Sequence, residues 1–305
     1  MNPRTEYLMR LLVEKAEEFV AEHTTTSLPK VSQAMCRRAQ ELVDKLKDDM
    51  SAGDTLAFNR HLVRLYCVIP RSMNGRDFIE TDPARLDLRI RYEQEFVTNV
   101  TGAVNGIITR NGTPQNRYEA IIMENGLSID AASEGDIAYI KGKMGHDAGK
   151  LIQAWKVANN PAQARYEKYK AERHITEEHT LWHGSTSGNF LSILTNGLTI
   201  RKSNRGMFGH GLYFARKFDK SRGYCSVLNS RWAHGNDSSA LLALFSVATG
   251  RPLELSDSLT SLDPGCRKLD GYDSVWAHAG ASLRNDEIVV YDDRACSIRY
   301  IVQTR

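Results

Sequence analysis

The sequence predicts an α+β protein whose N-terminal part is all helical and whose C-terminal part mixes strands with helices. Up to about residue 100, apolar residues recur at spacings of three and four, as on the buried face of a helix. After residue 105, glycines become frequent and short β-rich runs appear between turn residues. This order favours α+β over a doubly wound sheet, in which strands and helices alternate regularly.

The N-terminal part is expected to hold four helices. They cover residues 8–20, 31–46, 54–69 and 82–97. Turn and cap residues separate them: Pro29 lies in the first gap, Asp54 can serve as an N-cap, and Pro70 ends the third helix. Asp82-Pro83 is typical of a helix start.

The C-terminal part is expected to hold the strands. The β-rich runs are residues 118–123, 137–140, 180–183, 211–215, 240–248, 287–291 and 297–302, and helices are expected at 148–155, 188–196 and 217–224. We place a domain boundary at about residues 100–115, from Thr101-Gly102 to Asn111–Pro114, and divide the chain into a helical domain of residues 1–105 and a second domain of residues 106–305.

Composition excludes several classes of protein. No apolar run approaches a membrane span, and the N-terminus has no apolar core of a signal peptide. A net charge of +3 is too small to indicate nucleic-acid binding by itself. The five cysteines are scattered without C-x-x-C spacing, which argues against a metal site and suits a reducing compartment. We therefore expect an intracellular protein that needs neither membrane nor metal.

Two short segments combine apolar strand residues with glycine and a polar side chain, and a third adds a carboxylate. They centre on His183-Gly184-Ser185, on Tyr213 within Gly211–Ala215, and on Glu287 at the head of an apolar strand. Glycine lets a flat ligand approach the backbone, which favours a binding pocket. Taken singly, such a histidine, tyrosine or glutamate is more often a structural or solvated residue.

The order of these residues, His183, then Tyr213 in G-x-Y-F-A, then Glu287 before I-V-x-Y-D, resembles the triad of the poly(ADP-ribose) polymerase catalytic domain. The resemblance runs from about residue 166 to the end. It implies an ADP-ribosyltransferase fold of two packed antiparallel or mixed sheets with flanking helices. The helical N-terminal part is similar to the regulatory domain that precedes this fold in the family.

The resemblance implies an enzyme that cleaves NAD, releases nicotinamide and transfers ADP-ribose to protein acceptors, with possible automodification and elongation of poly(ADP-ribose). Glu287 would stabilise the oxocarbenium ion that forms as the glycosidic bond breaks, together with His183 and Tyr213. The residues expected to bind NAD are His183, Gly184, Ser185, Asn189, Gly211, Tyr213, Ser221 and Tyr224. The two tyrosines would stack on nicotinamide, and Gly184 and Ser221 would hold its amide.

Two other functions are compatible with these residues. A mono-ADP-ribosyltransferase, or an inactive module that binds ADP-ribose or a partner, would share most of these residues.

Asn285 stands where arginine-modifying transferases carry a second glutamate, so arginine is a poor first acceptor. Thr199 replaces an arginine that some polymerases place near the adenosine, and Arg201 or Arg205 could serve instead as a partner of the pyrophosphate. Regulation by DNA damage, and a nuclear location in a eukaryote or a cytoplasmic one otherwise, follow from the family alone.

Overall fold

The computed structural model describes residues 1–26, 30–71, 78–108, 117–200, 205–227, 230, 237–280 and 282–305. Pro29, the proposed boundary residues Asn111–Pro114 and Arg201 lie outside these ranges, and the side chain of Arg205 is not described either.

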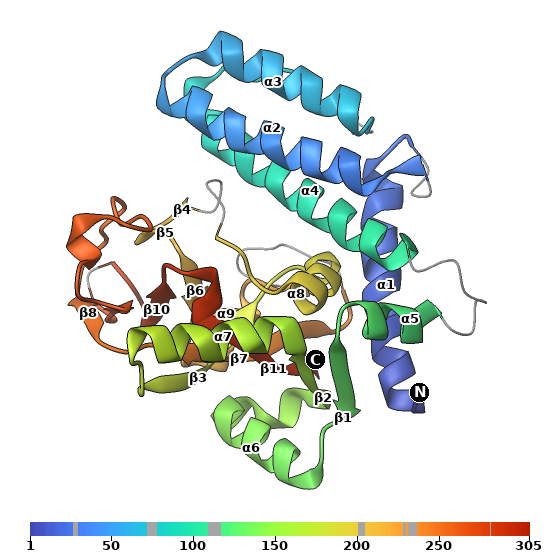
Figure 1. The fold of residues 1–305 in the computed structure, drawn as a ribbon, viewed down its shortest axis with the longest axis vertical. Coiled ribbons are helices and arrows are strands. Elements are labelled where there is room, and N and C mark those ends of the chain that lie inside the picture. Colours follow the sequence, from blue (N-terminus) through green and yellow to red (C-terminus); the bar gives the residue numbers. More distant parts are fainter. Residues whose placement is uncertain are drawn as a thin grey trace.

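All four expected N-terminal helices are present. They are α1 (Pro3–His23), α2 (Gln33–Ser51), α3 (Thr55–Val68) and α4 (Leu86–Ile108), the last preceded by a 3-10 turn at Pro83–Arg85. Asp54 caps α3 as expected, because its carboxylate accepts a hydrogen bond of 2.8 Å from the backbone N–H of Ala57. Figure 1 shows α2, α3 and α4 packed together above the sheets, while α1 runs down one side.

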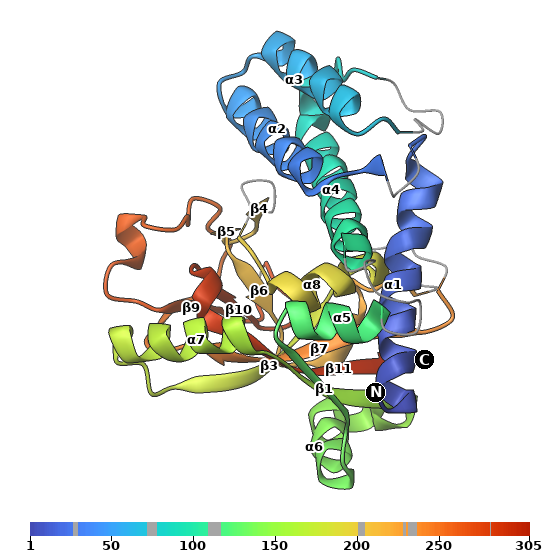
Figure 2. The ribbon, with the colours of Figure 1, turned by 45° about the vertical axis from the view of Figure 1, so that its right-hand side comes forward.

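Helix α1 belongs to both parts of the molecule. Near its start the ring of Tyr7 stacks on Trp155 at 6.1 Å, and the indole N–H of Trp155 donates to the carbonyl of Arg4 at 2.8 Å. Further along, α1 packs against α4 (Figure 2). One continuous apolar cluster therefore joins the helices to the sheets. The division of the chain at residue 105 stays a prediction, and α4 continues past it to Ile108.

Two sheets form the C-terminal part. The five-stranded sheet is antiparallel and has the order β1 (Leu127–Ala131), β2 (Leu151–Asn159), β11 (Cys296–Thr304), β7 (Ala240–Ala248), β3 (Glu178–Gly184). The four-stranded sheet has the order β6 (Leu212–Phe214), β10 (Glu287–Val290), β9 (Ser274–Ala277), β8 (Pro252–Leu255), with β8 and β9 parallel. A short hairpin joins β4 (Arg205–Gly206) to β5 (Gly209–His210).

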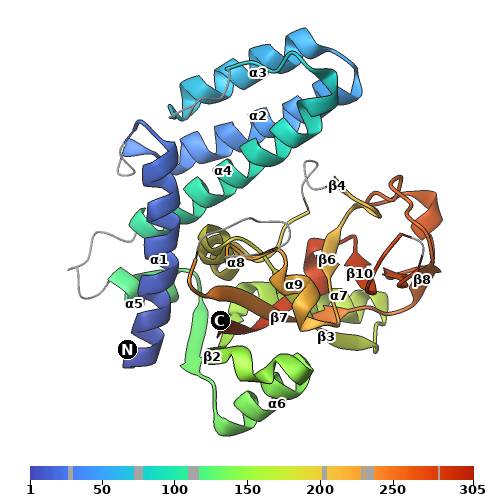
Figure 3. The ribbon, with the colours of Figure 1, turned by 180° about the vertical axis from the view of Figure 1, so that it is seen from behind.

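The two sheets meet where β3 runs beside the end of β6. Trp182 and Ala215 exchange backbone hydrogen bonds of 2.8 and 2.9 Å, and the rings of Phe214 and Phe245 pack at 5.7 Å between the sheets. Helices α5 (Arg117–Glu124), α6 (Glu134–Met144), α7 (Asn160–Arg173), α8 (Phe190–Asn196) and α9 (Phe218–Arg222) surround them (Figure 3). The α+β class with two packed sheets is therefore confirmed.

Three sequence predictions are wrong. Residues 118–123 and 137–140 are helical, in α5 and α6, and residues 151–155 of the expected 148–155 helix belong to strand β2. In each case a short apolar run was read with the wrong period, because four to eight apolar residues suit a buried helix as well as a strand. A capping box between Ser133 and Asp136 stabilises the start of helix α6. Hydrogen-bonded pairing with β1 and β11 stabilises residues 151–155 as part of strand β2.

The remaining expected strands are confirmed, most closely at Ala240–Ala248, where all nine residues are buried. Helix α9 is shorter than the expected 217–224 segment and ends at Arg222. Helix α7 was missed, although Asn159 at its N-cap and Pro161 in its first turn are start signals. Within the described residues, no helix is both long and apolar enough to cross a membrane.

Candidate active site

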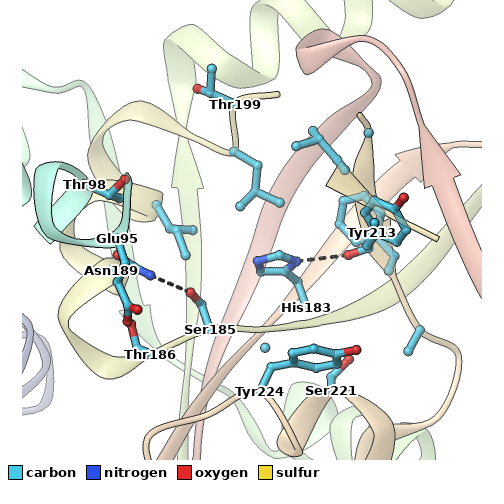
Figure 4. A pocket seen from close by; sticks show the side chains of 18 of the residues that line it. Glu95, Thr98, His183, Ser185, Thr186, Asn189, Thr199, Tyr213, Ser221 and Tyr224 are labelled. Atoms are coloured by element: carbon cyan, nitrogen blue, oxygen red, sulfur yellow. Dashed lines mark hydrogen bonds between the residues drawn. The ribbon is translucent and has the colours of Figure 1, made fainter. Parts of the chain in front are cut away.

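A cavity of about 600 Å³ opens between helix α4 and the line where the two sheets meet. This volume lies within the range typical of small-molecule sites. Its walls include every residue that the resemblance assigned to NAD binding or catalysis: His183, Gly184, Ser185, Asn189, Gly211, Tyr213, Ser221, Tyr224 and Glu287. Figure 4 shows the side chains of His183, Ser185, Asn189, Tyr213, Ser221 and Tyr224 around one space. Residues up to 104 positions apart in the chain are thus brought together.

His183 lies near the end of β3 with its ring turned into the cavity (Figure 4). Its Nδ1 lies 3.1 Å from the carbonyl oxygen of Tyr213, so Nδ1 carries the proton and donates it there. Burial lowers the pKa of His183, which keeps the imidazole neutral. The neutral ring then offers the lone pair of Nε2 as an acceptor, which suits a ligand hydroxyl.

Gly184 allows a close approach of two backbones. A Cβ at this position would lie 1.9 Å from the carbonyl oxygen of Ser221, so any side chain would push β3 away from α9. Ser221 itself is buried and ends up beside the glycine because α9 packs on β3. The residue type at 184 therefore determines how closely the two walls of the cavity approach each other.

The turn Ser185–Asn189 forms the wall beneath α4. The side-chain amide of Asn189 donates to Ser185 Oγ at 2.9 Å (Figure 4). The amide oxygen of Asn189 is buried and has no hydrogen-bond partner among the described residues. A buried acceptor without a partner is costly, and a ligand donor would satisfy it.

Tyr213 and Tyr224 lie at different walls of the cavity. The hydroxyl of Tyr213 donates to the Gly209 carbonyl at 2.7 Å and accepts from the Phe208 N–H at 3.0 Å, which fixes its ring against the hairpin of β4 and β5. Tyr224 follows α9 and its side chain is more open, at 42% exposed. In Figure 4, Tyr213 lies above His183 while Tyr224 and Ser221 lie below it.

Glu287 is the first residue of β10 and is buried at 8% exposure. Its Oε1 lies 2.7 Å from Nζ of Lys220, which also donates to the Asn285 carbonyl at 2.8 Å. The sequence reasoning missed Lys220. A signal existed, because Lys220 directly precedes Ser221 in the same short helix.

Helix α4 supplies a wall whose individual residues were not identified from the sequence. Arg91, Gln94, Glu95 and Thr98 line the cavity opposite the strands, and Thr199 lines its edge. Burial raises the pKa of Glu95. No local pattern marks these residues, because only the docking of α4 brings them to the cavity.

Comparison with known proteins agrees with this geometry. Residues 134–279 match the family model of the poly(ADP-ribose) polymerase catalytic domain. Just under half of the chain is thus similar to this catalytic domain. The matched segment holds His183, Tyr213 and Lys220 and ends before Glu287. Among the described residues, no group of three or more histidine, cysteine, aspartate or glutamate side chains is arranged to hold a metal ion.

Curated relatives carry names of the poly(ADP-ribose) polymerase family. Poly [ADP-ribose] polymerase 1 of Xenopus laevis is 24% identical over 94% of this chain and 32% of its own length. The poly [ADP-ribose] polymerase of Drosophila melanogaster is 27% identical over 93% and 32%. Protein mono-ADP-ribosyltransferase PARP3 of Gallus gallus is 26% identical over 50% and 33%. The chain thus spans about a third of the length of these relatives, whose names include both polymer-forming and mono-transferring enzymes.

Proposed function

We propose that this chain is an NAD-dependent ADP-ribosyltransferase that releases nicotinamide and transfers ADP-ribose to protein side chains, including its own. The buried Glu287–Lys220 pair carries the proposal, because it places a fixed carboxylate in the cavity that His183 and Tyr213 also line. The chain's match to the family domain supports the same reaction.

In the proposed complex the nicotinamide ring stacks between Tyr213 and Tyr224, and Gly184 and Ser221 hold its carboxamide. Neutral His183 accepts a hydrogen bond from a hydroxyl of the adenosine ribose. Ser185 and Asn189 line the same end of the cavity, where a ligand donor would satisfy the buried amide oxygen of Asn189, which has no hydrogen-bond partner among the described residues. Gly211 belongs to the backbone beside Tyr213.

The proposed reaction breaks the bond between C1′ of the ribose and the nicotinamide nitrogen, and the electron pair leaves with nicotinamide. Positive charge then develops on the sugar, as in glycoside hydrolysis. The carboxylate of Glu287, held by Lys220, would bind the ribose 2′-hydroxyl and stabilise this charge. An acceptor oxygen attacks C1′ and loses its proton to Glu287 or to solvent.

We further propose that the enzyme elongates poly(ADP-ribose). The support is the glutamate at position 287, since an incoming ribose hydroxyl needs a carboxylate to polarise it. Gel mobility of automodified protein separates the two outcomes, because polymer gives a smear and single units give a sharp band. A sharp band at saturating NAD would favour the mono-ADP-ribosyltransferase instead.

The reaction itself is tested by nicotinamide release from NAD with the full chain and with Glu287→Gln. Loss of one preorganised charged group of this kind lowers kcat by about 10²–10³. Glu254→Gln is the matched control, because Glu254 is an exposed glutamate on β8 of the same sheet, paired with His278. A Glu287→Gln variant as active as the wild type would remove Glu287 from the mechanism, and a wild type that only binds ADP-ribose would favour the inactive module.

We also propose that the helical layer restrains the enzyme until a signal displaces it, and that DNA damage is such a signal. The support is the position of α4, whose residues Gln94, Glu95 and Thr98 form one wall of the cavity. Deleting residues 1–100 would confound this test, because α1 covers Trp155 and Ile129 of the catalytic sheet. A local displacement of α4 is a cleaner experiment and is described below.

A further inference from the structure

A small bracket of hydrogen bonds holds the turn Ser185–Asn189 behind the cavity. Asp237 lies at its centre: its Oδ2 accepts from Ser187 Oγ at 2.6 Å, and its backbone N–H donates to the Ser226 carbonyl at 2.8 Å. The bracket closes where the backbone N–H of Ser187 donates to Ser226 Oγ at 3.0 Å. We call Ser187, Ser226 and Asp237 the Asp237 bracket.

The bracket ties two walls of the cavity together. Ser187 lies between Ser185 and Asn189, which line one wall, and Ser226 lies two residues after Tyr224, which lines another. Asp237 itself does not line the cavity. A hydrogen bond to a carboxylate is stronger than one between neutral groups, and Ser187 is only 4% exposed. The bracket therefore sets the separation of the two walls without touching a ligand.

Helix α1 is attached to the bracket by an ion pair. Nζ of Lys15 lies 3.0 Å from Oδ1 of Asp237 and 2.9 Å from Glu18 Oε2. The Lys15 side chain is 28% exposed and Asp237 is 20% exposed, so solvent screens the pair only in part. Phe19, one turn further along α1, lies against Gly188 of the same turn.

We propose that Asp237 is a positioning residue for the NAD site and that Lys15 of α1 supports it. This rests on the proposed function, since the turn that Asp237 holds is the one assigned to the ribose of NAD. The proposal also gives helices α1 and α4 different roles. Loss of the α1 contact weakens NAD binding, whereas displacement of α4 exposes the cavity and strengthens it.

The test uses the full chain with Asp237→Asn, Lys15→Met and the double variant, and measures nicotinamide release against NAD concentration together with Tm. Asp237→Asn should raise KM about fivefold to tenfold while kcat stays within about twofold of the wild type, because uniform binding is lost and the reacting groups remain. Lys15→Met should raise KM less, and the double variant should match Asp237→Asn, since both residues act through one link. Arg38→Met, which breaks an exposed pair with Glu41 on α2, is the control.

A folded Asp237→Asn variant with the KM of the wild type would overturn the inference, as would a fall in kcat and Tm at constant KM. If Asp237→Asn fails to fold, Lys15→Met still tests the inference, because an unchanged KM in Lys15→Met would overturn the proposed support of the NAD site by α1. A wild type without nicotinamide release would contradict the proposed function instead. In that case calorimetry with NAD decides, and equal Kd values for wild type and Asp237→Asn would overturn the positioning role.

Discussion

The ammonium nitrogen of Lys220 lies 2.7 Å from Oε1 of Glu287, with only 12% and 10% of the two side chains exposed. Lys220 comes from helix α9 and Glu287 from strand β10, so the pair ties a helix to an inner strand of the four-stranded sheet. Removing one partner of such a buried ion pair costs more folding free energy than removing both, because the remaining charge stays buried without compensation.

Removing Lys220 alone should therefore lower the free energy of unfolding more than removing both charges does. We expect Lys220→Met to lose up to about 3 kcal/mol of unfolding free energy, because an uncompensated carboxylate stays buried. The double variant Lys220→Met with Glu287→Gln should recover part of that loss. Urea unfolding of the wild type, both single variants and the double variant measures the coupling, and strictly additive losses would contradict an interacting pair.

Gly184→Ala should distort the cavity. The added Cβ would lie 1.9 Å from the Ser221 carbonyl, so β3 and α9 must move apart and the wall that carries Ser221 shifts. We expect loss of NAD binding by calorimetry and a lower Tm. Gly142→Ala in α6 is the matched control, because nothing lies within 4 Å of its Cβ and alanine favours a helix by about 1 kcal/mol. Wild-type NAD affinity in Gly184→Ala would refute this close approach.

Stability should fall as the pH drops below about 6.5, partly because of His183. Burial lowers the pKa of His183 in the folded state, whereas the unfolded chain binds a proton near the ordinary value of about 6.5. Below that pH the unfolded state holds more protons, so acid favours unfolding. His183→Gln cannot titrate and should lose less stability than the wild type between pH 7.5 and 5.5 in urea unfolding. Equal losses would show that His183 is not the group responsible.

Pushing α4 away from the cavity should raise activity. A Cβ at Gly102 of α4 would meet the Cβ and backbone nitrogen of Ser192 at 3.3 Å, so Gly102→Leu cannot keep α4 seated on α8. We expect a several-fold lower KM for NAD and faster nicotinamide release. Gly142→Leu, at an open position of α6, controls for the added side chain. Slower release from a folded Gly102→Leu variant would indicate that α4 supports the site and does not restrain it.

Local sequence signals predicted much of the fold. Asp54 and Asp82 mark helix starts because their side chains accept from backbone N–H groups two or three residues on, a purely local contact. Strand β7 was predictable because a run of nine residues, all apolar except Ser246, suits a strand buried on both faces. Residues 151–155 were not, since their strand state depends on pairing with β1 and with the distant β11. For residues 137–140 a local signal existed in the capping box of Ser133 and Asp136, but the short apolar run was assigned to a strand.

The sequence by itself determined which residue types meet in the candidate site, because His183, Tyr213 and Glu287 stand in short glycine-containing or apolar segments with a recognisable order. Only the tertiary structure decided what surrounds them. The Lys220–Glu287 pair, the wall made by Glu95 and the link from Lys15 to Asp237 each join elements distant in the chain. Such contacts depend on how helices dock on sheets, and no spacing within a single segment encodes that docking.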